Sequence, residues 1–393
     1  MKLEKKYYLF QLFFNLLLWI PIFYEFQKLN GLTDVQIFNI QSIYYLAFIV
    51  FELPTGFFAD FVGKKKSLVL GAGLLAFANI LPLIKVTFIL FLAHFVLIAL
   101  ARSLISGTAS ALLYDSLKVR GISNQFKEIE GKARSMALIA RLLTWPIASF
   151  FFKISPTSPY LVTFLFCLVA LFVSITLPID KTNVQKESAK SEMISSFKYI
   201  FQAKDVLVFM VQGTGLFILQ RVCMLQLFQP LLKQNNIDVA MFGMVMSVMT
   251  AAEALCSAQS NKLSRFLPND RLSLPILTIV LAMAFILLGK TNGYYTVTLL
   301  ITFSGFCGLI FPIQKQLLND SIQRDHQRST ILSIESIIQR SIASIFTFSI
   351  GYFISKGSLD RLFQWTGVAI ISIILMTIIV TKLKKRQSEC HVS

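Results

Sequence analysis

The chain has 393 residues, of which 55% are hydrophobic and only 15% are charged, with a formal net charge of +17 and a mean hydropathy of +0.68. Soluble domains do not contain so many long apolar segments. Nucleic-acid binding is not expected, because the basic residues are scattered over many short segments. The composition therefore indicates an integral membrane protein.

Long segments without Asp, Glu, Lys or Arg recur along the whole chain. A bilayer core needs about 20 apolar residues in a helix. The segments must be helical, because open backbone in lipid would leave its amides unsatisfied. We expect twelve membrane-spanning helices, at residues 7–29, 34–60, 67–85, 87–117, 134–153, 159–179, 205–229, 238–261, 271–289, 294–319, 328–355 and 361–381.

The basic residues are distributed unevenly between the expected loops. If the N-terminus lies inside, 25 of the 37 Lys and Arg residues fall on the cytoplasmic side and seven on the outer side. Cytoplasmic loops carry an excess of Lys and Arg. This pattern predicts a multi-pass protein of the inner (cytoplasmic) membrane, with both termini and residues 180–204 in the cytoplasm and with Lys85, Lys153 and Lys290 outside.

A motif near the end of the second expected span occurs twice. Residues 52–66 read ELPTGFFADFVGKKK, and residues 253–265, placed 201 residues later, read EALCSAQSNKLSR. Two shorter pairs recur in the same order, LYDSL with LNDSI and DVQIF with DVAMF. Three ordered matches predict a duplicated unit of about 200 residues, which is the layout of a secondary transporter. We expect an N-terminal half at 1–180, a cytoplasmic linker at 181–204 and a C-terminal half at 205–393.

Ionisable residues inside the expected spans are the candidates for a transport site, because a charge in hydrocarbon costs at least a few kcal/mol. Apart from the terminal residues Lys85, Arg271 and Arg361, spans 3, 6, 9 and 12 contain none, which predicts that these four helices face lipid. The candidates are Glu25, Glu52, Arg102 and Arg141 in the first half and Arg221, Glu253, Lys315, Glu335 and Arg340 in the second half.

The carboxylates among these candidates can serve proton coupling, because a carboxylate removed from water can take up a proton near neutral pH. We assign this role to Glu52, Glu253 and Glu335, of which the first two occupy matching repeat positions. The other six residues are candidates for the substrate cavity, and Arg102 and Arg221 hint at an anionic group on the substrate. A fixed ion pair that locks two helices together is the alternative interpretation for each residue.

Histidine and cysteine give no sign of a catalytic or metal centre. The three histidines are far apart in the sequence, and the five cysteines have no paired spacing. We therefore expect no metal, no cofactor and no enzymatic activity. His94 in the fourth span is interpreted as a packing residue, with a transport role as the alternative.

The motif between spans 2 and 3, in a chain of twelve spans and two repeats, resembles the major facilitator superfamily. The motif residues are Gly56, Asp60, Gly63, Lys64 and Lys65. The resemblance covers essentially the whole chain and implies an all-α membrane fold with two six-helix halves. It further implies alternating access around a site lined by spans 1, 4, 7 and 10, assisted by spans 2, 5, 8 and 11.

In the resembling family, the acid at the position of Asp60 faces span 11 and helps to hold one gate closed. The resemblance implies that its partner here lies near Arg328. The family usually has Arg directly after the acid, whereas this chain has Phe61, which removes one expected gate ion pair. Asp115 and its repeat counterpart Asp320 complete the expected gating residues.

These observations predict a proton-coupled secondary transporter of a small organic solute, a monomer whose partners are the solute, protons and the lipid bilayer. Export is preferred and uptake of a nutrient or metabolite is the close alternative. The glycine pattern of drug antiporters in span 5 is missing, since no Gly occurs between Ala133 and Phe152. A transporter-like receptor that moves nothing is the other class, but the chain has no large soluble appendage that would favour it.

Overall fold

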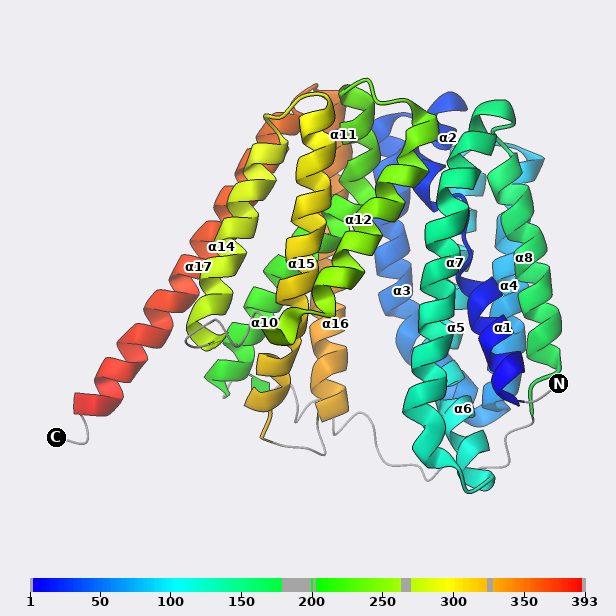
Figure 1. Cartoon of the computed structure of the whole chain (residues 1–393), viewed down its shortest axis with the longest axis horizontal. Helices are drawn as coiled ribbons and strands as arrows, with labels where there is room; N and C mark the ends of the chain where they lie inside the picture. Colours follow the sequence, from blue (N-terminus) through cyan, green and yellow to red (C-terminus); the bar gives the residue numbers. More distant parts are fainter. Residues whose placement is uncertain (1–2, 179–198, 201–202, 263–269, 324–327, 391–393) are drawn as a thin grey trace. The chain divides into compact units, whose positions relative to one another are not determined.

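The computed structural model describes the chain except for residues 1–2, 179–198, 201–202, 263–269, 324–327 and 391–393. All elements in the described residues are helical (Figure 1). Among these residues, eleven helical stretches are long and apolar enough to cross a membrane. A shorter apolar helix, Ser273–Leu288, falls where the ninth span is expected. The fold class predicted from the sequence is therefore confirmed.

The first six expected spans are built from α-helices interrupted by short turns. The elements are α1 (Leu3–Asn15), η1 (Ile20–Ile22), α2 (Phe23–Leu29), α3 (Asp34–Val62), α4 (Lys64–Ile84), α5 (Phe88–Ile105), α6 (Thr108–Val119), η2 (Ser123–Gln125), α7 (Phe126–Ile154) and α8 (Ser158–Ile175). Pro21 lies in the 3₁₀ turn that separates α1 from α2, where its missing N–H cannot continue an α-helix. Gly107 has a φ of 75° and separates α5 from α6, a conformation that glycine adopts without strain.

The later spans follow the same pattern, with one exception in the seventh. The elements are α10 (Lys204–Phe217), η3 (Ile218–Leu227), α11 (Phe228–Gln234), η4 (Val239–Met241), α12 (Phe242–Ser257), α14 (Asp270–Leu288), α15 (Tyr294–Ser321), α16 (Arg328–Ser355) and α17 (Leu359–Cys390). The exception is η3, which is a π-helix that joins α10 to α11. The seventh span therefore carries a wider helical turn in its middle.

Contacts divide the chain into two compact units. Unit 1 contains Met1–Lys186, Ile237–Ser247 and Ser344–Gly351. Unit 2 contains Glu187–Asn236, Val248–Ala343 and Tyr352–Ser393. Unit 1 thus combines the first six spans with short segments of α12 and α16. The division into 1–180, 181–204 and 205–393 stays a prediction, and most of the expected linker lies outside the described residues.

The four spans without charged residues pack in pairs, α4 against α8 in unit 1 and α14 against α17 in unit 2. Large apolar side chains are exposed on each of them, such as Phe77 on α4, Phe172 on α8, Met283 on α14 and Met376 on α17. Apolar side chains on an outer surface suit a lipid environment. Charged spans such as α7 and α16 expose large apolar side chains as well, for example Leu143 and Ile345, so the lipid-facing position of the four helices stays a prediction.

Aromatic and polar side chains form the core of unit 1. Trp19 donates a hydrogen bond from Nε1 to Oδ1 of Asn79 at 2.8 Å, and its ring stacks on Tyr160. His94 is fully buried against both rings, and its Nδ1 lies 2.7 Å from the carbonyl oxygen of Ala78. These contacts tie the break between α1 and α2 to α4, α5 and α8.

A backbone contact in unit 2 depends on Gly308 of α15. A Cβ atom at this position would lie 2.2 Å from the carbonyl oxygen of Glu253 on α12. The two helices can approach so closely only because the side chain is absent. By contrast, a Cβ atom at Gly73 would meet Leu171 at an ordinary 3.8 Å.

We expect Gly308→Ala to destabilise the protein by about 1–3 kcal/mol, because backbone atoms cannot move aside as a flexible side chain can. Gly73→Ala is the matched control and should leave the melting temperature equal or higher, since alanine favours the helix. Thermal unfolding of both variants in detergent, followed by size-exclusion chromatography, measures the difference. Equal melting temperatures for the two variants would contradict the close contact at Gly308.

Candidate functional site

The first copy of the repeated motif, residues 52–66, lies at the junction of α3 and α4. Gly63 ends α3 with a φ of 101°, and α4 begins at the next residue, Lys64. A residue with a side chain would be strained in this left-handed region. Gly56 is exposed on α3. Asp60 belongs to the last turn of α3, but its side chain lies outside the described part of the chain.

Two of the expected gating residues form an ion pair. Lys64 at the start of α4 contacts the Oδ2 atom of Asp115 on α6, and their side chains are 15% and 21% exposed. Lys65, which follows Lys64 in the sequence, is half-buried. In the second half, Asp320 is exposed at the end of α15 and Arg328 is half-buried at the start of α16. The structure therefore joins the motif to the end of the fourth span, 51 residues further along the chain.

Glu130, a carboxylate that the sequence did not indicate as a candidate, connects three elements of unit 1. Glu130 on α7 accepts hydrogen bonds from Tyr7 of α1 at 2.5 Å and from Ser110 of α6 at 3.0 Å. Its Oε1 atom also accepts one from Arg134 at 2.9 Å. The sequence placed Glu130 in a loop, and only the extension of α7 to Phe126 brings it into the bundle.

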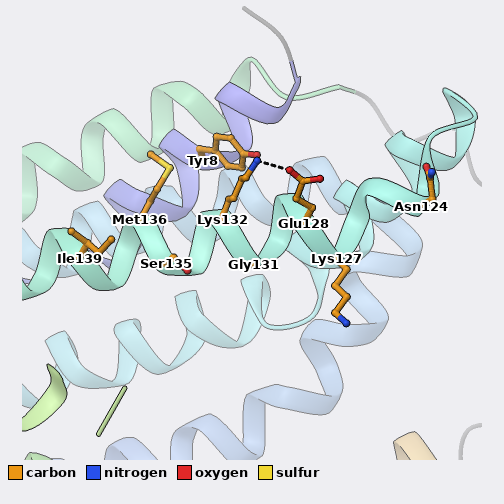
Figure 2. A pocket seen from close by; sticks show the side chains of 9 residues that line it. All are labelled: Tyr8, Asn124, Lys127, Glu128, Gly131, Lys132, Ser135, Met136 and Ile139. Carbon is orange, nitrogen blue, oxygen red and sulfur yellow. Dashed lines mark hydrogen bonds and ion pairs between the residues drawn. The ribbon is translucent and has the colours of Figure 1, made fainter. Parts of the chain in front are cut away.

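A groove of about 720 Å³ lies between α1 and the first turns of α7 (Figure 2). Tyr8 of α1 lies beside Lys132, which forms an ion pair of 2.5 Å with Glu128. Lys127 points to the opposite side of α7, and Met136 and Ile139 continue the groove as exposed apolar side chains. The groove contains none of the charged residues that the sequence predicted for the substrate cavity.

In unit 1, the predicted cavity residues Glu25, Arg102 and Arg141 and the predicted proton-coupling residue Glu52 lie on four different elements. Glu25 is buried in α2, Glu52 is half-buried on α3 and Arg102 is half-buried on α5. Arg141 on α7 is half-buried, with its guanidinium 5.7 Å from the centre of the Trp145 ring. A cation over an indole face is stabilised there. The positive charge of Arg141 therefore has an aromatic partner within its own helix.

A hydrogen bond holds two of these elements together next to the candidates. The hydroxyl oxygens of Thr55 on α3 and Ser103 on α5 are 2.6 Å apart. Thr55 lies one turn after Glu52, and Ser103 directly follows Arg102. The turn that carries the carboxylate is thus fixed against the turn that carries the guanidinium.

The repeat counterpart of Glu52 has a different environment, in unit 2. The Nε2 atom of Gln220 donates a short hydrogen bond to Oε1 of Glu253. Gln220 and the exposed Arg221 both lie in the π-helix η3. π-Helical turns are rare and occur frequently at functional sites. The sequence contains no signal for this turn, and Gln220 was missed for that reason.

Unit 2 contains a second polar site, which we call the Lys315 cluster. It consists of Lys315, Glu335, Gln314 and Gln339. Nζ of Lys315 on α15 lies 2.6 Å from Oε2 of Glu335 on α16. Oε1 of Glu335 accepts from Nε2 of Gln339 at 2.9 Å and from Nε2 of Gln314 at 3.5 Å. The carboxylate side chain is only 2% exposed, whereas the lysine side chain is 32% exposed. Arg340, the remaining candidate, is half-buried next to Gln339 in the sequence.

The position of Gln314 depends on a glycine in α10. Its Nε2 atom also donates to the carbonyl oxygen of Phe209 at 3.0 Å. A Cβ atom at Gly213 would lie 2.1 Å from that Nε2 atom. Three helices, α10, α15 and α16, therefore meet around one buried carboxylate. The sequence predicted the two charged members of the cluster but neither the amides nor the glycine.

A further set of contacts in unit 1 joins α3 to the end of α16. The Ser42 hydroxyl donates to the carbonyl oxygen of Ser344 at 2.9 Å, and the Ser344 hydroxyl donates to that of Ser42 at 3.0 Å. Further along α16, a Cβ atom at Gly351 would lie 2.8 Å from Cα of Val35. The two helix backbones are thus in direct contact.

The start of α12 is attached to α7 in a similar way. A Cβ atom at Gly243 would lie 2.0 Å from the carbonyl oxygen of Trp145. Lys153 at the end of α7 forms an ion pair of 2.5 Å with Asp238. The hydrogen bonds from Lys153 and from the Ala240 amide hold the pKa of Asp238 below its usual range. The carboxylate therefore stays charged, and the ion pair persists, to a lower pH than an ordinary aspartate would allow.

Comparison with known proteins identifies the family. The model of the Major Facilitator Superfamily matches residues 8–229, which is more than half of the chain, and the protein therefore belongs to this superfamily. No curated protein sequence matches the chain. Membership in this family indicates a multi-pass membrane transporter rather than an enzyme.

Solved structures of transporters share the fold at low sequence identity. The nucleoside transporter NupG has a TM-score of 0.74 at 13% identity, covering 97% of this chain and 100% of that chain. A D-xylose-proton symporter has a TM-score of 0.73 at 10% identity, with coverages of 95% and 96%. A POT family transporter in complex with 5-aminolevulinic acid has a TM-score of 0.71 at 13% identity, with coverages of 96% and 94%. These similarities confirm the fold predicted from the sequence.

We expect Asp115→Asn to slow transport about two- to tenfold without reducing the amount of folded protein. The partly exposed ion pair with Lys64 contributes about 1 kcal/mol, enough to shift a two-state equilibrium about fivefold. Lys66→Gln is the control, because Lys66 is exposed next to the motif. Initial transport rates, normalised to purified protein, provide the measurement. Equal rates for Asp115→Asn and the parent would remove this pair from the gating residues.

Proposed function

We propose that the protein is a secondary transporter that couples the movement of a small organic solute to that of protons and works by alternating access. The observation that carries the proposal is a pair of carboxylates, Glu253 and Glu335, held by polar partners inside membrane-spanning helices of unit 2. The fold similarity to a D-xylose-proton symporter supports proton coupling. Nothing in the described residues favours export, so the proposal concerns coupling and leaves the direction open.

The partner of Glu253 supports a role in carrying protons. A glutamine side chain both donates and accepts hydrogen bonds, so Gln220 can pair with the carboxylate through Nε2 and with the protonated acid through Oε1. Glu253 therefore changes its protonation state without breaking an ion pair in this contact. Glu52, its repeat counterpart, is proposed to act in the first half.

We expect Glu253→Gln to abolish solute accumulation driven by a pH gradient while leaving solute exchange intact. The substituted amide keeps the size and the hydrogen bond of the glutamate but cannot exchange a proton in this pH range. Glu52→Gln tests the first half in the same way. Vesicles containing the purified protein, with an imposed pH gradient, separate accumulation from exchange.

The control for both variants is Glu128→Gln, because Glu128 is exposed in the groove of Figure 2 and pairs only at the surface of α7. It should accumulate solute as the parent does. If Glu253→Gln and Glu52→Gln also accumulate solute normally, neither glutamate is the coupling site. A loss of folded protein would instead indicate a structural role.

The gating motif and the topology complete the proposal. Asp60 is proposed to stabilise one of the two access states together with Arg328, although the side chain of Asp60 lies outside the described residues. The excess of Lys and Arg in alternate loops supports cytoplasmic termini. The transporter is proposed to act as a monomer in the inner membrane.

Alternating access requires that segments of the second half part from helices of the first half. The contacts that unite α16 with α3 and α12 with α7 inside unit 1 are suited to this, since they consist of hydroxyl pairs, small residues and one exposed ion pair. Each contact is weak enough to break and specific enough to form again. We propose that these contacts form one of the two gates.

We expect a disulfide between Ser42→Cys and Ser344→Cys to block transport, because it would fix the gate in its closed state. The two hydroxyl oxygens are 2.9 Å apart, which suits the short reach of a disulfide. The double variant is made in a background in which the native cysteines, four of which are described as free, are replaced by serine. Transport is measured after oxidation and again after reduction with dithiothreitol.

The matched control is Thr55→Cys with Ser103→Cys, whose hydroxyl oxygens are 2.6 Å apart within the first four spans. This pair should form a disulfide without stopping transport, because both helices belong to the same half. Full activity of the oxidised Ser42→Cys and Ser344→Cys variant, with the disulfide verified by mass spectrometry, would refute the proposed gate.

A further inference from the structure

We propose that the Lys315 cluster binds a carboxylate group of the transported solute. When the solute binds, its carboxylate replaces that of Glu335 at the Lys315 ammonium, and Glu335 takes up one proton. The inference rests on the proposed proton-coupled transport and adds a substrate class to it, namely small carboxylates. Lys315 binds the solute carboxylate, whereas Glu335 carries the proton.

The unequal exposure of the two residues makes Lys315 the point of entry. Its side chain is 32% exposed, whereas that of Glu335 is 2% exposed. Lys315 lies six residues before Ser321 at the end of α15, and Glu335 lies seven residues after Arg328 at the start of α16. At a rise of 1.5 Å per residue, both are roughly 10 Å from the ends of their helices. A solute therefore reaches the ammonium first.

The ammonium can exchange one anionic partner for another. Lys315 has three N–H donors, and Oε2 of Glu335 accepts from Nζ at 2.6 Å. Nζ also lies 5.5 Å from the centre of the Phe311 ring, on its own helix. This cation–π contact does not involve Glu335, so it continues to hold the ammonium when the glutamate leaves.

Charge balance selects a solute group with a single negative charge. The partly buried pair of Lys315 and Glu335 is neutral overall, and it stays neutral if one carboxylate replaces another and the displaced glutamate gains a proton. A phosphate would leave an excess negative charge in a buried place, which is costly. A neutral sugar would gain nothing by separating the ion pair. The site therefore favours one carboxylate with one proton.

The amides of the cluster fit both states of Glu335. Gln339 and Gln314 each donate from Nε2 to Oε1 of the carboxylate. Oε1 of Gln314 is buried and accepts no hydrogen bond from the described residues. It can therefore accept one from protonated Glu335 or from a donor group on the solute. A carboxyl group that only locked two helices would not need an acceptor beside it.

The first experiment uses purified protein in vesicles that contain a pH-sensitive dye. The carboxylate probes are pyruvate, lactate, gluconate and 2-oxoglutarate, and the matched neutral probes are lactamide, glucose and uridine. Glucose 6-phosphate is the phosphate probe, and protein-free vesicles give the blank. We expect protons to move with at least one carboxylate and with none of the neutral or phosphate probes.

The second experiment separates the tasks of the two residues with the carboxylate that responds. We expect Lys315→Gln to weaken its binding about ten- to hundredfold, as for loss of a hydrogen bond to a charged group. Glu335→Gln should keep binding but move no protons. The double variant with both substitutions removes both charges, so it should fold like the parent and bind the carboxylate about ten- to hundredfold more weakly, as Lys315→Gln does. Lys290→Gln, at an exposed lysine beyond α14, should behave as the parent.

The outcomes separate this inference from the proposed function. Proton movement with neutral solutes or the phosphate probe alone would overturn the carboxylate site and leave proton-coupled transport standing. Carboxylate exchange without proton movement would keep the site and overturn the coupling. Unchanged carboxylate binding in the folded double variant would refute a role for Lys315. A lack of response to every probe would count against both proposals.

Discussion

A charged group inside the membrane must be held by the protein itself, because lipid offers neither water nor counterions. In unit 2 this constraint brings three helices together around the carboxylate of Glu335. Lys315 supplies the charge, two glutamines supply hydrogen bonds, and Gly213 leaves room for one of these amides. The same constraint does not apply to the spans whose interiors lack charge, where α4 packs on α8 and α14 on α17 through apolar side chains.

Close helix contacts replace the hydrophobic effect as the source of packing energy within a bilayer. At Gly308, Gly243 and Gly351, one helix backbone touches another so closely that a Cβ atom would clash. The contact at Gly308 lies within unit 2 and places the backbone of Glu253 against α15. The other two contacts lie in unit 1, where they attach the second-half segments of α12 and α16. Small residues therefore support both the contact within unit 2 and the contacts that we propose to separate during transport.

The sequence predicted the order of the spans and the fold family, because these features depend on hydropathy and on one short motif. It also predicted Lys315 and Glu335, since a charge in an apolar segment is visible without a structure. It could not predict the amides Gln220 and Gln339, because polar neutral residues are common in spanning helices. The π-helix depends on backbone hydrogen bonding over ten residues and has no compositional signal. Glu130 was missed because the start of α7 was placed eight residues too late.

The two carboxylates of unit 2 differ in the charge of their partners, and this difference suggests separate tasks. Glu253 pairs with a neutral amide, so its protonation leaves no cation without a counterion in that contact. Glu335 pairs with a cation, so its protonation would leave Lys315 without an anion. Only an incoming anion removes that penalty. In the proposed mechanism, proton uptake at Glu335 therefore requires the arrival of a solute, whereas the contact with Gln220 sets no such requirement on Glu253. A transporter that must not leak protons needs at least one site, such as Glu335, where proton uptake requires a bound solute.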